Sequence, residues 1–242
     1  MFRTRFKKEI IAEFLPPTRA RKKQNVIILL DGMPSLPNKK VLMEFLAQKG
    51  YWVFHPRWRG TWESDGELFA ASPVRDVLDV VSELPRGVTE LEGRRHFALS
   101  PYKIFAVGAS FGGCASLLAS IDSRVDKVVA CCPVVDWGAL KPVSFAADLK
   151  RTWGSAYRAP ARNWKKLGER GFFNPINHAD ELAPSKILIF HAKDDPYIPW
   201  QDVRRFAKQV GIPLKLLARG GHIGTESVVQ RHWAEISRFF AG

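Results

Sequence analysis

The stretch KIFAVGASFGG, residues 103–113, contains the strongest structural signal in the chain. Residues 103–107 are rich in aromatic and β-branched side chains, which predicts a short buried strand. The small residues from 113 to 119 predict a tightly packed helix directly afterwards. Ser110 would therefore lie on a sharp strand-to-helix turn, in a strained backbone conformation that projects its oxygen above the sheet.

Gly108 and Gly112 stand two residues before and two residues after Ser110. Bulkier side chains at these positions would collide across such a turn. The start of the following helix would also favour negative charge that develops beside the serine. Small residues occur in many ordinary turns, but a G-x-S-x-G pattern between a strand and a helix predicts a nucleophile elbow with a reactive serine.

The rest of the chain alternates predicted strands and helices. Strands are expected at 9–15, 26–30, 51–54, 125–132, 186–190 and 213–217, and further helices at 38–48, from 72 onward and at 225–240. Such alternation predicts an α/β fold, namely a doubly wound, mostly parallel sheet with helices on both faces. Because there is no internal repeat or low-complexity linker, we expect residues 1–242 to form a single domain.

The alternation stops between residues 138 and 183. This segment combines many basic residues with Trp153, Tyr157, Trp164, Phe172 and Phe173. It predicts irregular helices inserted before the last strands as a short cap. Its aromatic side chains exceed what a simple connection needs, so we expect Trp153 and Trp164 to face the substrate.

The composition restricts the classes of partner and compartment. Lys and Arg number 37 and Asp and Glu number 24, giving a net charge of +13. This surplus could attract nucleic acid, an acidic membrane surface or an anionic substrate. However, the basic residues are scattered and no nucleic-acid-binding motif accompanies them, so a solvated basic surface is the favoured interpretation. No apolar run approaches the ~18 residues that span a bilayer, and no secretory signal is recognised. A cytoplasmic location is therefore expected.

The three cysteines have no metal-site spacing and make a disulfide framework improbable. Cys131 and Cys132 are adjacent at the end of a predicted strand, where a disulfide between them would be strained. We expect all three to be small buried thiols.

A serine hydroxyl needs a base to act as a nucleophile, and the base needs an acid that orients it. The carboxyl ends of parallel strands, where a doubly wound sheet gathers its site, offer both. Asp194 and Asp195 follow the strand at 186–190, and His222 follows the strand at 213–217. For the acid, the residues also leave Asp136 open, and for the base they leave His191.

The order Ser110, Asp195, His222 resembles that of the α/β-hydrolase superfamily, most closely its prolyl-oligopeptidase and dienelactone-hydrolase-like branch. The segment DPYIP at 195–199 matches the D-x-x-[VI]-P acid loop of that branch, and Gly221-His222 matches its histidine loop. The resemblance covers nearly the whole chain. It implies Asp195, and not Asp194, as the triad acid. The chain is too short to include the propeller of the large members, so access would be controlled by the segment at 138–183.

The resemblance also implies an oxyanion hole formed by backbone N–H groups. Phe111, directly after the serine, supplies one donor, and Met33 in the loop at 28–34 supplies the other. Pro34 has no N–H to donate. The loop departs from the family pattern, because Asp31-Gly32 stands where His-Gly is usual.

The loop at 55–66 is the remaining distinctive segment, and its Arg59-Gly60 and Ser64 resemble a family pattern. We interpret it as a brace beneath the oxyanion loop. The alternative is that Arg57, Trp58 or Trp62 lines the substrate pocket and contacts a carboxylate or an apolar group.

These features predict a serine hydrolase that cleaves an ester or an amide or peptide bond through an acyl-enzyme, with no metal and no organic cofactor. The catalytic residues would be Ser110, Asp195 and His222, with Met33 and Phe111 as oxyanion donors. A small-molecule ester, amide or short peptide is the expected partner, with no specific nucleic acid and no membrane span; the sequence leaves the oligomeric state open. The alternatives are a non-catalytic binding protein on the same fold and an acyltransferase.

Overall fold

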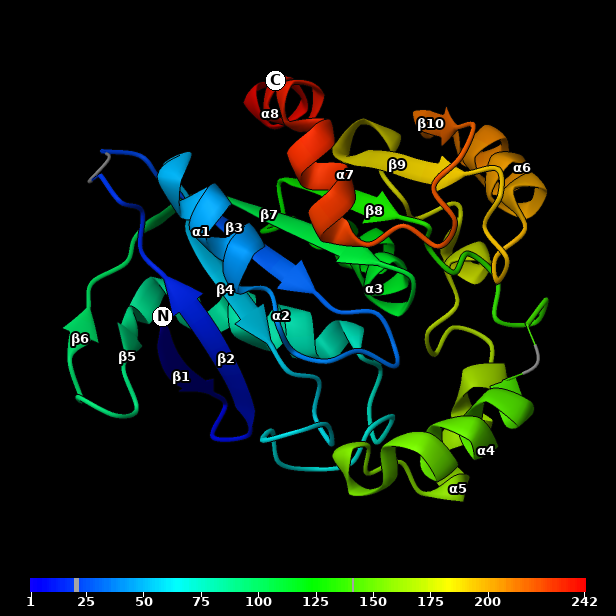
Figure 1. Cartoon of the computed structure of the whole chain (residues 1–242), viewed down its shortest axis with the longest axis horizontal. Helices are drawn as coiled ribbons and strands as arrows, with labels where there is room; N and C mark the ends of the chain where they lie inside the picture. The colour runs from blue at the N-terminus through cyan, green and yellow to red at the C-terminus, as the bar shows by residue number, and fades with distance from the viewer. Residues whose placement is uncertain (20–21, 141) are drawn as a thin grey trace.

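A computed structural model describes residues 1–19, 22–140 and 142–242 of the chain. Its main feature is an eight-stranded sheet in the order β1-β2-β4-β3-β7-β8-β9-β10 (Figure 1). The first three strands in this order pair antiparallel, and every later pair is parallel. The strands are β1 (Phe2–Phe6), β2 (Ile10–Leu15), β3 (Gln24–Leu30), β4 (Trp52–Pro56), β7 (Pro101–Ala109), β8 (Lys127–Cys131), β9 (Ile187–Ala192) and β10 (Leu214–Leu217). The predicted α/β fold with a mostly parallel sheet is confirmed.

Helices cover both faces of this sheet, as predicted. One face carries α1 (Lys40–Gln48), α7 (Thr225–Arg231) and α8 (Trp233–Ala241), and the other carries α2 (Val74–Glu83), α3 (Phe111–Ala119) and α6 (Trp200–Val210). Alternate residues of β3 supply the two cores: Ile27 and Leu29 face the first, Ile28 and Leu30 the second. A strand buried on both faces needs apolar residues throughout, which explains the continuous apolar run in β3.

Three elements differ from the sequence-based expectation. Strand β1 was not predicted, because its alternation of apolar and basic residues looks like a basic N-terminal stretch; within the sheet, Phe6 is buried. Helix α6 was not predicted either, since its buried side chains (Val203, Phe206 and Ala207) lie among many charged residues. The helix predicted at 225–240 is two helices, which join at His232 with φ −113° and ψ 21°.

The segment at 138–183 consists of short helices, as expected. It includes α4 (Pro142–Trp153) and α5 (Ala161–Trp164), which lie together at one end of the molecule in Figure 1. Trp153 packs edge-on against Trp62, with ring centroids 6.0 Å apart, and Trp164 packs against Phe69 at 4.9 Å. Both tryptophans therefore pack on the 57–69 region of the chain.

Further small elements complete the fold. A two-stranded sheet pairs β5 (Val88–Thr89) with β6 (His96–Phe97). The three cysteines are buried and free, as predicted. None of the helices in the described ranges has the length and apolar character needed to span a bilayer.

Candidate active site

Ser110 occupies a sharp turn between β7 and α3, with φ 55° and ψ −116°. This positive φ is uncommon for a non-glycine residue and is the strained conformation expected at a nucleophile elbow. A Cβ atom on Gly108 would clash with the Gly112 carbonyl group, and one on Gly112 would clash with the carbonyl group of Leu30. Both glycines are therefore required by the close approach of backbone to backbone around the serine.

Asp195 and His222 are brought together by the loops that follow β9 and β10. The distance from His222 Nδ1 to Asp195 Oδ2 is 2.8 Å. Asp195 Oδ1 accepts hydrogen bonds from the backbone N–H groups of Tyr197 and Ile198, at 2.9 and 3.1 Å. Burial alone would raise the pKa of Asp195, but the hydrogen bonds from His222 and these two N–H groups outweigh it and lower the pKa to about 2. The carboxylate is therefore ionised and oriented toward the imidazole.

The rival side chains have other partners. Asp194 Oδ1 accepts a hydrogen bond from the backbone N–H of Gly221 at 2.8 Å, which fixes the loop that holds His222. Asp136 Oδ1 accepts hydrogen bonds from the backbone of Gly138 and the side chain of Asn174. His191 is fully buried, and its Nε2 lies 3.0 Å from the carbonyl oxygen of Ile198.

A cavity of about 610 Å³ lies over Ser110 and His222. Apolar side chains form most of its wall, among them Met33, Phe111 and Trp137. In the described ranges, no hydrogen bond joins the Ser110 hydroxyl to His222. Catalytic hydrogen bonds are often long before substrate binds, so the shared cavity is the feature that relates the two side chains.

The loop after β3 lies directly against the serine. A Cβ atom on Gly32 would come within 3.4 Å of Ser110 Cβ, which shows how closely this loop approaches the turn. Met33 is the next residue, and Phe111 begins α3 on the other side of the serine; both line the cavity. Two backbone N–H groups from separate elements thus belong to residues beside Ser110.

Asp31 anchors the same loop, although the family pattern has histidine at this position. Its Oδ2 lies 2.8 Å from His55 Nε2, and its Oδ1 lies 3.1 Å from Lys39 Nζ. Its backbone carbonyl accepts a hydrogen bond from Trp58 Nε1. Burial opposes ionisation of Asp31, but the positive charges of His55 and Lys39 prevail and lower its pKa to about 2. The roles of Asp31 and Lys39 could not be predicted from the sequence, because their partners depend on the strand order.

We expect Asp31 and His55 to contribute to the free energy of unfolding in opposite pH ranges. The pKa of Asp31 is lowered from 3.8 to about 2, so its contribution is present above pH 4 and lost as the pH falls toward 2. The pKa of His55 is raised from 6.5, because Asp31 and Glu13 outweigh its burial; its contribution is present below pH 6.5 and lost as the pH rises through the folded-state pKa.

Chemical denaturation of Asp31→Asn and His55→Gln across this pH range measures both contributions. Acidification should lower the free energy of unfolding of Asp31→Asn by roughly 2 kcal/mol less than that of the wild-type protein, because each pKa unit corresponds to about 1.36 kcal/mol. Raising the pH through the folded-state pKa of His55 should lower the free energy of unfolding of the wild-type protein, and this loss should be missing in His55→Gln. The exposed Asp65 provides the control, as Asp65→Asn should retain both limbs of the curve. Wild-type pH profiles in both variants would refute the role of this ion pair.

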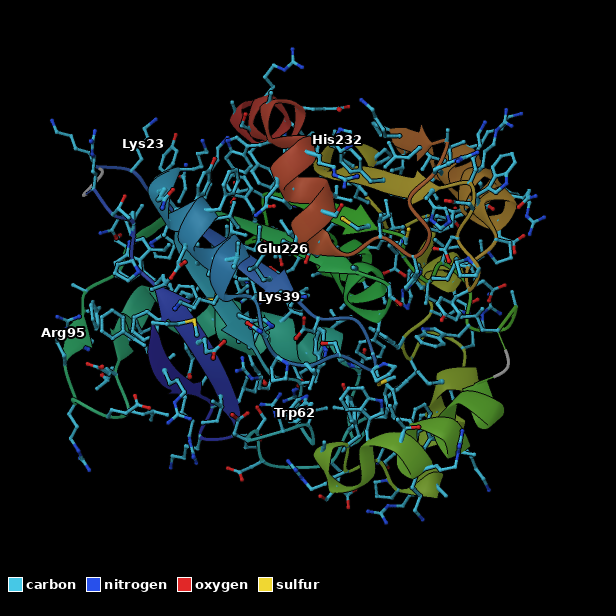
Figure 2. The ribbon with its side chains drawn as sticks, viewed as in Figure 1. Lys23, Lys39, Trp62, Arg95, Glu226 and His232 are labelled. Atoms are coloured by element: carbon cyan, nitrogen blue, oxygen red, sulfur yellow. The ribbon has the colours of Figure 1, made fainter. Side chains whose placement is uncertain are left out.

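The loop at 55–66 braces the site, as interpreted from the sequence. Arg59 forms ion pairs with Asp76 and Asp79 of α2, and Ser64 Oγ accepts a hydrogen bond from the backbone N–H of Ile11 at 2.9 Å. Arg57, Trp58 and Trp62 do not line the cavity. Figure 2 shows Trp62 on the side of the molecule where α4 and α5 lie.

The prediction that Trp153 and Trp164 face the substrate is wrong. Neither residue lines the cavity beside Ser110, because both rings are taken up by packing on residues 57–69. Within the described part of the 138–183 segment, Leu140 is the residue that lines this cavity.

One group of side chains has ligand atoms close enough for a metal ion. Cys132, His191 and Asp195 place one such atom each within 4.8 Å of one another. Burial raises the pKa of the Cys132 thiol to about 12, so it is protonated and a poor ligand. Both oxygens of Asp195 already accept hydrogen bonds. We therefore interpret Cys132 and His191 as side chains that pack behind the Asp195 carboxylate, and not as metal ligands.

The fold agrees with the comparison to protein families. Residues 39–238 match the model of the alpha/beta hydrolase family. The chain therefore belongs to the α/β-hydrolase family, and the predicted resemblance is confirmed. No curated protein sequence matches the chain.

Several solved structures share the fold. Acylaminoacyl peptidase from Pyrococcus horikoshii is 19% identical, with a TM-score of 0.65; the match covers 98% of this chain and 40% of the peptidase. Est1E from Butyrivibrio proteoclasticus is 15% identical, with a TM-score of 0.70 and coverage of 99% and 98%. The α/β-hydrolase GrgF from Penicillium sp. sh18 is 15% identical, with a TM-score of 0.71 and coverage of 96% and 95%. The chain thus spans less than half of the peptidase and nearly all of the other two.

Proposed function

We propose that the protein is a serine hydrolase in which Ser110, His222 and Asp195 form a catalytic triad. The observation that carries this proposal is the 2.8 Å contact between His222 and Asp195 beside a cavity that also contains the elbow serine. A serine in a strained turn, a histidine oriented by an ionised carboxylate and adjacent N–H donors are the parts that acyl transfer requires.

The mechanism follows from the protonation states. Ionised Asp195 accepts a hydrogen bond from the Nδ1–H group of His222, so the lone pair of the imidazole is on Nε2. Nε2 takes the hydroxyl proton as Ser110 Oγ attacks the acyl carbon, and it then protonates the leaving alcohol or amine. Water subsequently attacks the acyl-enzyme, with His222 again as the base, which releases the acid and restores the serine.

The backbone N–H groups of Met33 and Phe111 would stabilise the oxyanion of each tetrahedral intermediate. Phe111 begins α3, where the N–H groups of a helix have no partner within the helix. Met33 is held by the anchored Asp31-Gly32 segment. Preorganised donors of this type lower a barrier by about 3 kcal/mol each.

The cavity supports a substrate with an apolar part. Its volume of about 610 Å³ lies within the range of small-molecule sites, and its lining is mostly apolar. We propose a small ester, an amide or a short peptide as the substrate. A solved structure of Est1E contains ferulic acid, and relatives of this fold include a peptidase, so both ester and peptide substrates belong in the test.

The organisation and location of the protein stay predictions. The segment at 138–183 inserts before β9, which supports a cap within a single domain over residues 1–242. Three buried, free thiols fit a reducing compartment, which supports a cytoplasmic location.

Turnover of a substrate panel tests the proposed function. The panel contains p-nitrophenyl esters of two to eight carbons and short peptide p-nitroanilides. We expect cleavage of at least one ester above the uncatalysed rate, with free acid formed in equal amount to nitrophenol.

Two outcomes would favour the alternatives. Transfer of most acyl groups to an added alcohol, in place of water, would favour an acyltransferase. Absence of turnover in a folded sample that still binds the esters would favour a non-catalytic binding protein.

A further inference from the structure

Lys39 is the one permanently charged side chain among the described residues that line the cavity. It lies directly before α1, and Figure 2 shows it at the start of that helix, with Glu226 at the start of α7. The lysine side chain is 19% exposed, so it is partly withdrawn from solvent. A cation in a mostly apolar wall costs desolvation energy unless a partner compensates for it.

The partner within the protein is Asp31, but Asp31 is shared. Lys39 Nζ lies 3.1 Å from Asp31 Oδ1, while His55 Nε2 lies 2.8 Å from Oδ2 of the same carboxylate. One oxygen of the Asp31 carboxylate thus faces Lys39, and the other faces His55. An ammonium group has three N–H donors. Within the described ranges, Lys39 forms no ion pair with Glu226 or with any carboxylate other than that of Asp31.

The contacts behind Lys39 form a row of alternating charges. Beyond Asp31 and His55, Glu13 Oε2 lies 3.4 Å from His55 Nδ1, Arg57 pairs with Glu13 at 3.1 Å, and Arg57 also lies 3.5 Å from Glu63. Each ring nitrogen of His55 thus lies near a carboxylate, and Arg57 Nη1 also lies 3.3 Å from His55 Nδ1. The row begins with Lys39 at the cavity and ends with Glu63, whose side chain is 49% exposed to water.

This arrangement makes the cavity end of the row positive. The buried part contains the carboxylates of Glu13 and Asp31, the imidazole of His55 and the guanidinium of Arg57, with Lys39 at the cavity. The balancing carboxylate of Glu63 lies at the far end, where water screens it. Lys39 lines the cavity, whereas Asp31, Glu13 and Glu63 do not, so an anion in the cavity would meet the ammonium group before any carboxylate of the row.

Thr225 provides an independent observation in the same cavity. The residue borders the cavity and is 1% exposed. Its hydroxyl is buried and, among the described residues, has no hydrogen-bond partner. Buried polar groups are normally paired, so Thr225 adds an unsatisfied polar atom behind the cavity wall that Lys39 also borders.

We propose that Lys39 binds a carboxylate of the substrate, so that the enzyme prefers esters or amides with an apolar body and one negatively charged group. This proposal rests on the proposed hydrolase function. Lys39 acts here as a specificity-determining residue, while Ser110 and His222 carry out the chemistry.

Matched pairs of substrates test this preference. One pair carries the carboxylate on the acyl side, as the p-nitrophenyl monoester of suberic acid against p-nitrophenyl octanoate. The other carries it on the alcohol side, as 4-acetoxybenzoate against 4-acetoxybenzamide. The measured quantity is the ratio of kcat/KM for the charged substrate to kcat/KM for the neutral one, corrected for spontaneous hydrolysis.

We expect Lys39→Met to lower this ratio about tenfold in at least one pair, the loss typical of a charge-assisted contact. Lys39→Arg should keep the ratio near the wild-type value, which a purely steric role of the lysine would not predict. The matched control is Lys40→Met, since Lys40 is exposed and pairs only loosely with Glu44 at 3.9 Å. In the wild-type protein, raising the salt concentration should also lower the ratio, and this measurement requires no variant.

The failures of the two proposals are distinguishable. If the wild-type protein cleaves neutral esters but Lys39→Met leaves both ratios unchanged and salt has no effect, carboxylate recognition is refuted while the hydrolase function stands. If the folded wild-type protein cleaves neither member of either pair and no ester or peptide p-nitroanilide of the panel above, the hydrolase function itself is refuted.

Discussion

Replacing Ser110 with alanine is expected to lower kcat for p-nitrophenyl esters on the order of 10⁶-fold, as for the loss of a triad nucleophile in other enzymes. The hydroxyl oxygen forms the bond to the acyl carbon, and Ser110 is the one serine with a positive φ among the described residues. Because alanine is smaller than serine and keeps the Cβ atom, the turn between β7 and α3 should be preserved. Steady-state kinetics with matched thermal unfolding curves would measure the effect.

A control variant separates this effect from general damage. Ser237, on the exposed surface of α8, donates a hydrogen bond only to the carbonyl group of Ala234. Ser237→Ala should retain wild-type kcat and KM. Ester hydrolysis by Ser110→Ala at more than one hundredth of the wild-type rate, in a preparation free of contaminating esterase, would exclude Ser110 as the nucleophile.

Replacing Asp195 with asparagine is expected to lower kcat roughly 10⁴-fold with little change in KM. The amide cannot hold the Nδ1 proton of His222 as the carboxylate does, so the histidine would adopt the wrong tautomer. The amide oxygen can still accept the hydrogen bonds from Tyr197 and Ile198, which should preserve the loop.

The neighbouring residue provides the matched control. Asp194 accepts a hydrogen bond from Gly221 and holds the histidine loop, so Asp194→Asn should cost far less activity than Asp195→Asn. Comparison of kcat for the two variants, on the same ester and at the same pH, decides between them. Equal losses, or a greater loss from Asp194→Asn, would mean that the triad acid is assigned incorrectly.

Much of the fold could be predicted because the parallel strands are buried on both faces. Continuous apolar runs, such as 26–30 in β3, mark such strands without reference to the rest of the protein. Helix α6 escaped prediction because only one narrow face of it is buried. Strand β1 lies at the edge of the sheet, so its arginines can alternate with buried residues.

The site was predictable where its residues stand at the carboxyl ends of strands. Asp195 and His222 follow β9 and β10, which are adjacent and parallel, so their loops lie side by side. The partners of Asp31 depend instead on the pairing of β3 with β4, which places Ile28 beside Phe54 and brings His55 to the oxyanion loop. Sequence spacing does not contain that register, and for this reason the roles of Asp31 and Lys39 emerged only from the structure.

The aromatic residues of the 138–183 segment illustrate a different difficulty. An excess of aromatic side chains predicts a large apolar contact, but it does not say with what. Trp153 and Trp164 use their rings to pack on residues 57–69. The contact is therefore internal, and the cavity receives Leu140 from this segment.

Labelling with a fluorophosphonate tests the central claim most directly. This reagent phosphonylates a serine that has both a base and oxyanion donors, and ordinary hydroxyl groups react far more slowly. We predict that peptide mapping by mass spectrometry locates the adduct on Ser110 alone, and that His222→Ala abolishes labelling while the protein remains folded. Labelling of a different serine, or no labelling of a folded wild-type sample, would contradict the assignment of this protein as a serine hydrolase.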